Sequence, residues 1–152
     1  MAYWLFKTEP DAYSIEQLAE DRIAPWDGIR NYQARNRIRD EVADGDLVLV
    51  YHSSGRQPAV VGLARVKGGP RPDPTQFDPK SSGYDARSPS SDPRWYLVDL
   101  EFVESFPLAL TLQAIKQSKA LENMELVNRA RLSIQKVSGE EFVAICQQCK
   151  SS

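Results

Sequence analysis

Three apolar segments whose side chains alternate with a period of two constrain the fold of this chain most strongly. They are DLVLVYHS (46–53), PAVVGLARVK (58–67) and RWYLVDLEFVESF (94–106). Each is long enough for a strand, and the break at 54–58 predicts that the first two pair antiparallel. Successive residues of a strand point to opposite faces, and both sets in 46–53 are largely apolar. Both faces of that strand are therefore expected to be covered.

Two shorter segments extend this pattern toward the ends of the chain. The aromatic-rich AYWLFK (2–7) predicts a buried first strand, and ARLSIQKV (130–137) predicts a last one. The segment 68–93 carries six prolines and little periodicity, which is typical of a functional or disordered loop. Phe77 and Tyr84 favour an ordered loop, packed on the body of the protein through these two rings.

Helix starts are marked by residues that cap free backbone N–H groups. Ser14 and Ser138 are each followed three residues later by Gln or Glu, the pattern of a capping box. Ala34, Ile38 and Val42 form a narrow apolar stripe that predicts a helix over about 32–42. The expected caps are Ser14, Asn31, Thr111 and Ser138.

The strands and helices do not alternate, so the predicted class is α+β. We expect a small, curved, barrel-like sheet of about five or six strands flanked by short helices. A chain of 152 residues, of which 41% are hydrophobic and 26% charged, fits one domain over residues 1–152. No apolar run reaches the roughly 20 residues that span a bilayer, and the N-terminus lacks a signal-peptide pattern. The expected location is cytoplasmic, or nuclear in a eukaryotic cell, with no membrane partner.

The residue inventory argues against most enzyme classes. His52 is the only histidine, and its neighbour Ser53 points to the opposite face of the strand, so the two form no catalytic pair. P-loop, G-x-G-x-x-G and H-E-x-x-H patterns are absent from the sequence. Cys146 and Cys149 with one histidine give fewer than the four ligands of a structural metal site, so they are interpreted as thiols on a terminal helix. No cofactor and no metal are expected.

The stretch WDGIRNYQARN (26–36) is better suited to recognition than to catalysis. It carries two arginines, Arg30 and Arg35, and no acid after Gly28, together with amide groups and aromatic rings, although the formal net charge of the chain is −2. Stacking faces with donors and acceptors beside them suit a flipped or single-stranded base. Trp26 lies between Pro25 and an Asp-Gly turn, where core packing gives little reason for a tryptophan. Charges spread evenly over the surface remain the alternative explanation for the arginines.

Seven blocks of this sequence, in order from about residue 3 to about residue 145, resemble the EVE-domain family. The resemblance implies a PUA-like curved pseudo-barrel related to the YTH readers of methylated RNA. The segment 84–88 (YDARS) departs from a Y-D-P-K-S element of that family, which leaves the role of this loop open. The blocks are YWLFKTEP (3–10), WDGIRNYQARN (26–36), GDLVLVYHS (45–53), VVGLARV (60–66), PDPTQFDP (72–79), PRWYLVD (93–99) and RLSIQKV (131–137).

The resemblance also implies non-catalytic binding of a nucleic acid, DNA or RNA, with a methylated or hydroxymethylated base in a pocket. In that interpretation Trp26 forms a wall, Asn31 and Ser53 bond the base edge, and two arginines contact phosphate. The implied site residues are Lys7, Glu9, Trp26, Gly28, Arg30, Asn31, Tyr32, Arg35, Tyr51, His52 and Ser53. Two alternatives stay open. One is an enzyme acting on modified nucleotides with His52 as acid or base, and the other is a small-molecule or protein-interaction domain using the same pocket.

Overall fold

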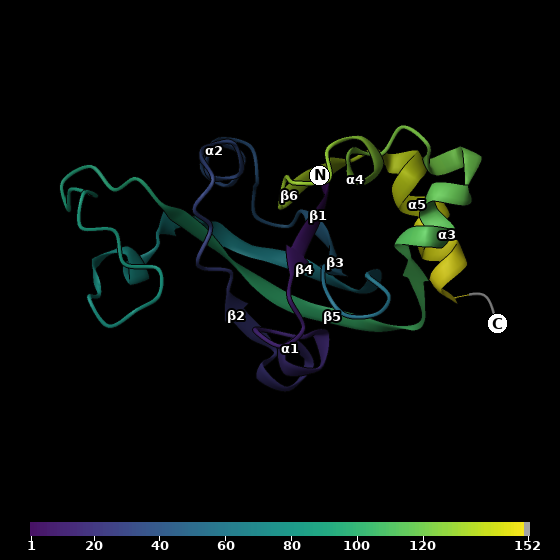
Figure 1. Ribbon diagram of the computed structural model, residues 1–152, viewed down its shortest axis with the longest axis horizontal. Coiled ribbons are helices and arrows are strands. Elements are labelled where there is room, and N and C mark those ends of the chain that lie inside the picture. Colours follow the sequence, from purple (N-terminus) through teal and green to yellow (C-terminus); the bar gives the residue numbers. More distant parts are fainter. Residues whose placement is uncertain (151–152) are drawn as a thin grey trace.

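A six-stranded mixed sheet organises the computed structural model, which describes residues 1–150. The strand order is β2-β5-β4-β3-β1-β6, and the edge strands β2 and β6 do not pair within the described residues, so the sheet stays open. The fold is α+β with six strands, as the sequence predicted, and the sheet is curved and open (Figure 1). The strands are β1 (Tyr3–Thr8), β2 (Ile23–Pro25), β3 (Leu47–His52), β4 (Ala59–Pro72), β5 (Tyr96–Thr111) and β6 (Ile134–Val137).

The long antiparallel pair β4 and β5 forms the axis of the molecule (Figure 1). The loop between these strands lies at one end of the axis, and the helices near the C-terminus lie at the other. The predicted antiparallel pairing of β3 with β4 is confirmed, whereas β1 joins β3 in parallel. The helices are α1 (Ile15–Asp21), α2 (Tyr32–Asp40), α3 (Leu112–Gln117), α4 (Glu125–Asn128) and α5 (Gly139–Lys150), with short 3₁₀ turns at Pro74–Phe77 and Lys119–Leu121.

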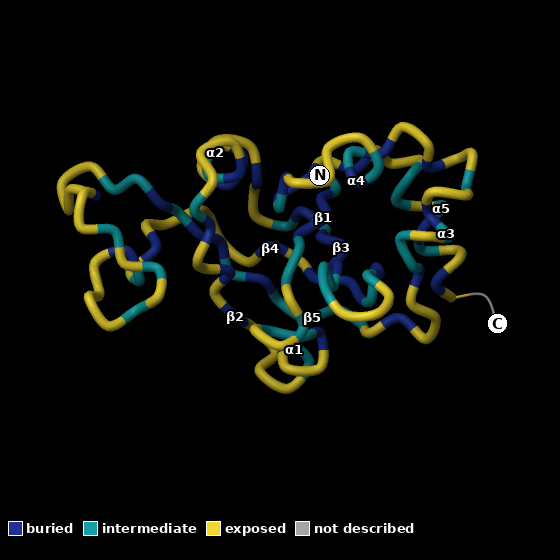
Figure 2. The backbone as a smooth tube through the Cα atoms, viewed as in Figure 1, coloured by how far each residue is buried: buried dark blue, intermediate teal, exposed yellow. Residues whose placement is uncertain are grey.

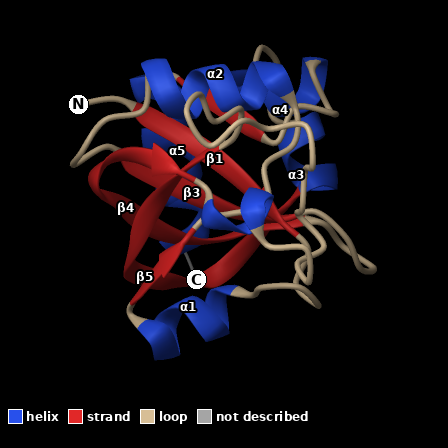
Figure 3. Ribbon diagram, turned by 90° about the vertical axis from the view of Figure 1, so that its left-hand side faces the viewer, coloured by secondary structure: helices blue, strands red, loops and turns tan. Residues whose placement is uncertain are grey.

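The sheet carries a hydrophobic core on each face, which confirms the prediction that both faces are covered. On β3, Val48 and Val50 enter one core, and Leu49 and Tyr51 enter the other. Helices α1 and α2 contribute to the first core, and α3, α4 and α5 contribute to the second. The helices lie around the strongly curved sheet (Figure 3). The chain is most deeply buried along the central strands, and the loop between β4 and β5 is the most exposed part of the fold (Figure 2).

The predicted helix caps are formed. Ser14 and Gln17 make a reciprocal capping box at α1, and the Asn31 side chain accepts from the backbone N–H of Ala34 at the start of α2. The Ser138 hydroxyl likewise accepts from the Glu141 N–H at the start of α5. Ala34, Ile38 and Val42 are all buried, as the stripe predicted. Each cap satisfies a backbone N–H that has no partner inside its own helix.

Polar contacts, and not the two predicted aromatic rings, hold the loop after β4. Phe77 and Tyr84 remain 38% and 45% exposed, so their expected packing was wrong. Buried Asp73 and Gln76 anchor the loop, and the Gln76 amide bonds the backbone oxygens of Asp73 and Trp95. These bonds fix a segment that has few apolar side chains to bury.

Candidate nucleic-acid interface

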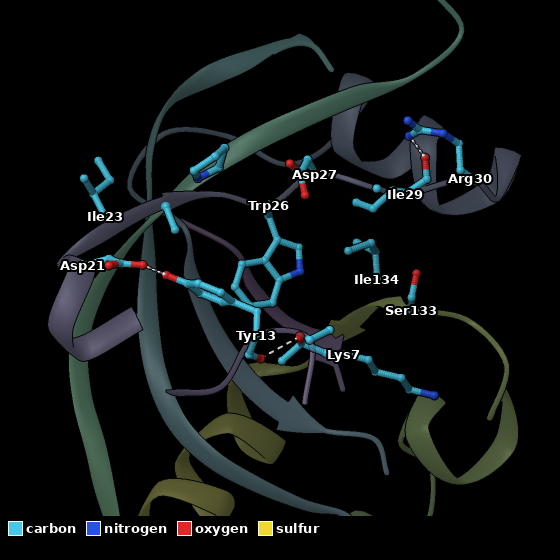
Figure 4. Close-up of a pocket in the computed structure, with 15 residues that line it drawn as sticks. Lys7, Tyr13, Asp21, Ile23, Trp26, Asp27, Ile29, Arg30, Ser133 and Ile134 are labelled. Atoms are coloured by element: carbon cyan, nitrogen blue, oxygen red, sulfur yellow. Dashed lines mark hydrogen bonds between the residues drawn. The ribbon is translucent and has the colours of Figure 1, made fainter. Parts of the chain in front are cut away.

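A cavity of about 540 Å³ opens beside β1 and β2, over the core that α1 and α2 cover. Three stretches of the chain build its wall, namely residues 7–13, residues 21–30 and the pair Ser133 and Ile134 (Figure 4). The volume lies within the range of roughly 300–1,000 Å³ that is usual for ligand sites. Of the site residues predicted from the sequence, it brings together Lys7, Trp26, Gly28 and Arg30.

Trp26 is both a core residue and a wall of this cavity. Its side chain is buried, and its backbone N–H donates to Val98 on β5. The ring of Tyr13 meets the indole edge-on, with the ring centroids 5.9 Å apart, and Phe6 packs at 6.3 Å. Trp26 therefore also stabilises the core, a role that the sequence did not predict. Its indole N–H forms no hydrogen bond with any of residues 1–150.

Tyr13 and Asp21 form a second side of the cavity. The Tyr13 hydroxyl donates to Asp21 Oδ2 at 2.6 Å, and burial, together with that carboxylate, raises the pKa of the tyrosine well above its ordinary value. The hydroxyl therefore stays protonated, and the Asp21 carboxylate already accepts a hydrogen bond from it.

Arg30 closes one end of the cavity through a complete set of hydrogen bonds. Its five N–H groups donate to the Gly83 carbonyl twice, to the Ile29 carbonyl, to Asp73 and to Thr75, at 2.6 to 3.1 Å. A guanidinium has five N–H donors in total. Arg30 therefore fastens the loop after β4 to the Trp26–Arg30 segment, and a phosphate would have to displace one of these bonds.

Asp73 is the acceptor around which this junction is arranged. Its side chain is fully buried and accepts from Arg30, from Thr75 and from the backbone N–H of Gly28. Burial alone would raise the pKa of this carboxyl, but the hydrogen bonds that it accepts lower the pKa below its ordinary value. Gly28 has a φ of +81°, which a residue with a side chain adopts only with strain.

Lys7 lies at the edge of the cavity with its amine directed away from Trp26 (Figure 4). The ammonium donates to the Ala130 carbonyl and lies 5.9 Å from the centroid of the Tyr51 ring. Burial lowers the pKa of Lys7 from its ordinary value. The lysine thus holds the segment before β6 beside the cavity.

Asn31, Tyr32 and Arg35 lie outside this cavity. Asn31 caps α2 and lines a neighbouring, more open hollow of about 340 Å³ together with Arg129 and Arg131. Tyr32 stacks on Trp95 with centroids 4.9 Å apart, and the Arg35 guanidinium lies 5.0 Å from the centre of the tyrosine ring. Tyr32 therefore already has two neighbours at its ring, although about half of the residue stays exposed.

The residues 51–53 also fail to reach the cavity. Tyr51 is buried in the core on the opposite face of the sheet, because alternate residues of β3 point to opposite sides. His52 Nε2 accepts from the backbone N–H of Ile15 at 3.1 Å, and burial, only partly offset by Glu16, lowers the pKa of the imidazole. Ser53 contributes a backbone N–H to the Thr8 carbonyl. The predicted grouping of these residues with Trp26 is therefore not what the fold produces.

Glu9 is exposed in the turn after β1, where its carbonyl accepts from the backbone N–H groups of Ala12 and Tyr13. Its side chain does not line the cavity. The turn that it belongs to positions Tyr13, which does. Glu9, in the family block KTEP, therefore affects the cavity through the turn that its backbone carbonyl helps to form.

Among the lining residues that the sequence did not predict are Tyr13, Asp27 and Ser133. Asp27 was interpreted only as half of an Asp-Gly turn signal, and a carboxylate directly after a wall tryptophan could have been noticed. Partial burial, followed by repulsion from Asp73, raises the pKa of Asp27, while Arg30 and the backbone oppose this rise. No comparable signal marks Tyr13 or Ser133, because both reach the cavity only through the tertiary fold.

No cluster of three or more His, Cys, Asp or Glu side chains suited to a metal occurs within residues 1–150. Cys146 is half-buried and Cys149 buried on α5, and both are free thiols. Burial raises the pKa of both, that of Cys149 to about 11. No helix in the described part of the chain is long and apolar enough to cross a membrane.

Comparisons with known proteins agree on the relationship. Mouse thymocyte nuclear protein 1 is 38% identical over 92% of this chain and 70% of its own length. A hypothetical protein from Leishmania major superposes with a TM-score of 0.94 at 40% identity, covering 98% of this chain and 94% of that one. The human THYN1 protein in complex with 5-methylcytosine containing DNA superposes with a TM-score of 0.93 at 33% identity, covering 100% and 99%. Residues 2–148 match the EVE domain, and this chain belongs to the EVE-domain family.

Proposed function

We propose that this protein is a non-catalytic reader of a modified cytosine in DNA, and that the modified base enters the cavity beside Trp26. The observation that carries the proposal is the cavity itself, with an indole wall, polar groups around it and a volume of about 540 Å³. A base leaves the stack at a cost of a few kcal/mol, which stacking on an aromatic ring and hydrogen bonds along its edge offset. The relative solved with 5-methylcytosine containing DNA supports cytosine as the base and DNA as the carrier.

Phosphate contacts are expected from cations that the fold leaves accessible. Arg30 has committed all of its N–H groups to the loop after β4. Arg35 is half-buried with its guanidinium over Tyr32, and Arg131 is exposed at the rim of the neighbouring hollow. We assign phosphate contact to these two, with Arg30 holding the site in shape. Each contacted duplex phosphate adds about 0.9 to the slope of log affinity against log salt.

Two other functions have less support. An enzyme using His52 would need that side chain at the cavity, and its Nε2 is occupied by the Ile15 N–H elsewhere. A small-molecule or protein-interaction domain would use the same cavity without a nucleic-acid backbone. Competition of free nucleosides against oligonucleotides separates that function from the proposed one. A free nucleoside makes no phosphate contacts, so it should compete poorly for a DNA reader.

The test is a titration with oligonucleotides that differ at one position, carrying cytosine, 5-methylcytosine or 5-hydroxymethylcytosine. Trp26→Phe keeps a ring against Phe6 and Tyr13, so the fold survives more readily than after Trp26→Ala. Removal of a stacking ring costs roughly 1–3 kcal/mol per base, and the smaller phenyl ring of Trp26→Phe loses part of this, so binding of the modified oligonucleotide should weaken by about threefold to tenfold. Trp4→Phe is the matched control, because Trp4 is buried in the same core and does not line the cavity. Unchanged affinity of a folded Trp26→Phe protein contradicts the proposal.

A further inference from the structure

Asp27 carries the one carboxylate of the cavity that no other described side chain occupies. The second lining carboxylate, Asp21, accepts the Tyr13 hydroxyl. Asp27 accepts from its own backbone N–H and from no other group among residues 1–150. It follows directly after the wall residue Trp26, and both side chains line the same cavity (Figure 4).

The turn does not need the Asp27 side chain. The N–H of Gly28, which an aspartate in a turn would commonly bind, donates instead to Asp73 at 2.8 Å. Asp27 also lies close enough to Asp73 for the two negative charges to repel each other. Asp27 is exposed at the cavity, so a ligand can reach its carboxylate. A ligand with a hydrogen-bond donor could therefore bond the Asp27 carboxylate without displacing any other side chain.

We infer that Asp27 is the specificity residue of the cavity, where its carboxylate accepts from the exocyclic amino group of a cytosine-type base and excludes thymine. This inference rests on the proposed function, because it states which residue contacts the polar edge of the base beside Trp26. 5-Methylcytosine and thymine share the ring and the 5-methyl group and differ along one edge, where 5-methylcytosine has an amino group at position 4 and a bare N3, and thymine has a carbonyl oxygen and an N3–H. Shape and stacking are nearly the same for both bases. The polar edge is therefore what distinguishes them.

The carboxylate separates the two bases by attraction and by repulsion. An ionised carboxylate is an acceptor only, so it bonds the amino group of 5-methylcytosine. In the same position, thymine places its O4 oxygen against the carboxylate. Both groups are acceptors, so no hydrogen bond forms between them. A base that covers the carboxylate without offering it a donor takes water from it and gives no hydrogen bond in return, which lowers the affinity for that base. A single good base-edge contact gives about five- to 150-fold discrimination, so a preference of tenfold or more is expected.

The experiment compares 5-methylcytosine and thymine, each placed opposite an abasic site in an otherwise identical duplex, so that the cost of unpairing is equal. Binding is measured for the wild-type chain, Asp27→Asn and Asp40→Asn. The asparagine has nearly the same shape but presents an amide that both donates and accepts. Asp40 is exposed at the end of α2 outside the cavity, and its variant controls for the loss of one negative charge near DNA.

The wild-type protein and Asp40→Asn should prefer 5-methylcytosine over thymine by tenfold or more. Asp27→Asn should reduce that ratio at least fivefold, largely by gaining affinity for thymine. A folded Asp27→Asn protein that keeps the wild-type ratio overturns the inference, and so does a wild-type protein that binds both duplexes equally. The proposed function fails separately, when Trp26→Phe binds the 5-methylcytosine duplex as tightly as the wild-type chain does.

Discussion

Arg30 and Asp73 form an ion pair of 3.1 Å that joins the segment after Trp26 to the loop after β4. The Asp73 side chain is fully buried and that of Arg30 is 25% exposed. The same carboxylate accepts the Gly28 N–H, so one group fixes both the turn beside Trp26 and the anchored loop. Removing one partner of a buried pair leaves the other without compensation and costs about 3–5 kcal/mol.

Asp73→Asn should therefore lower the free energy of unfolding by about 3 kcal/mol or more, measured by urea denaturation at pH 7. Asp99→Asn breaks a more exposed ion pair with Arg71 and should cost about 0–1 kcal/mol. Because the folded-state pKa of Asp73 lies below the unfolded value, its contribution is complete above about pH 4 and is lost as the pH falls through the folded pKa. Equal denaturation midpoints for the wild-type chain and Asp73→Asn at pH 7 would contradict this role.

Arg37 provides a second test of a long-range ion pair. It donates twice to Glu125 on α4, at 2.6 and 3.0 Å, and once to the Ile134 carbonyl, and it is buried. Arg37→Met should cost about 3 kcal/mol because Glu125 and a carbonyl lose their donors. Arg65→Met, at an exposed pair, should cost about 0–1 kcal/mol. The prediction is wrong if thermal denaturation shows the same loss for both variants.

Asp27→Asn should stabilise the protein in the absence of DNA. The folded-state pKa of Asp27 is raised, by partial burial first and by Asp73 second, so its charged form is disfavoured in the fold. The variant's advantage should be complete above the folded-state pKa and should vanish as the pH falls below the unfolded value of about 4. Melting temperatures of both proteins across this range check the prediction. A variant that melts below the wild-type protein at pH 7 would show that the carboxylate is structural.

His52→Asn should leave DNA binding unchanged, because the imidazole lies outside the cavity. The folded-state pKa of His52 is lowered by burial, so protonation favours the unfolded chain. Stability should therefore fall as the pH drops from above about 6.5 through the folded-state pKa, and the variant should lack this component. Loss of binding with an intact fold, or a nucleotide turnover that the variant abolishes, would restore His52 as a functional residue.

The sequence predicted the elements whose signals are local. Asn31 and Ser14 were identified as caps because capping depends on residues three positions apart, and β3 was identified by its alternation. The three residues of β2, which end at Pro25, are too few to carry a period. The parallel pairing of β1 with β3 was not predicted, because it depends on contacts far apart in the sequence.

The candidate site was predicted less well than the fold for the same reason. Tyr51, His52 and Ser53 were assigned to one site because their block resembles that of the family. The alternation of the strand nevertheless predicts opposite faces for Tyr51 and His52, and the structure confirms this. Arg30 was expected at phosphate, and its partners Asp73, Thr75 and Gly83 lie more than forty positions away. The contact of Trp26 with Tyr13 joins the turn before α1 to the residue after β2, and no local pattern encodes such a tertiary contact.

The most direct measurement is a crystal structure of this chain with a short duplex that carries one 5-methylcytosine. The account predicts the methylated base out of the helix and in the cavity, with its ring against Trp26 and its amino group within hydrogen-bond distance of Asp27. A methylated base that stays stacked in the duplex, or one bound at another surface while the cavity beside Trp26 stays free of DNA, would contradict it.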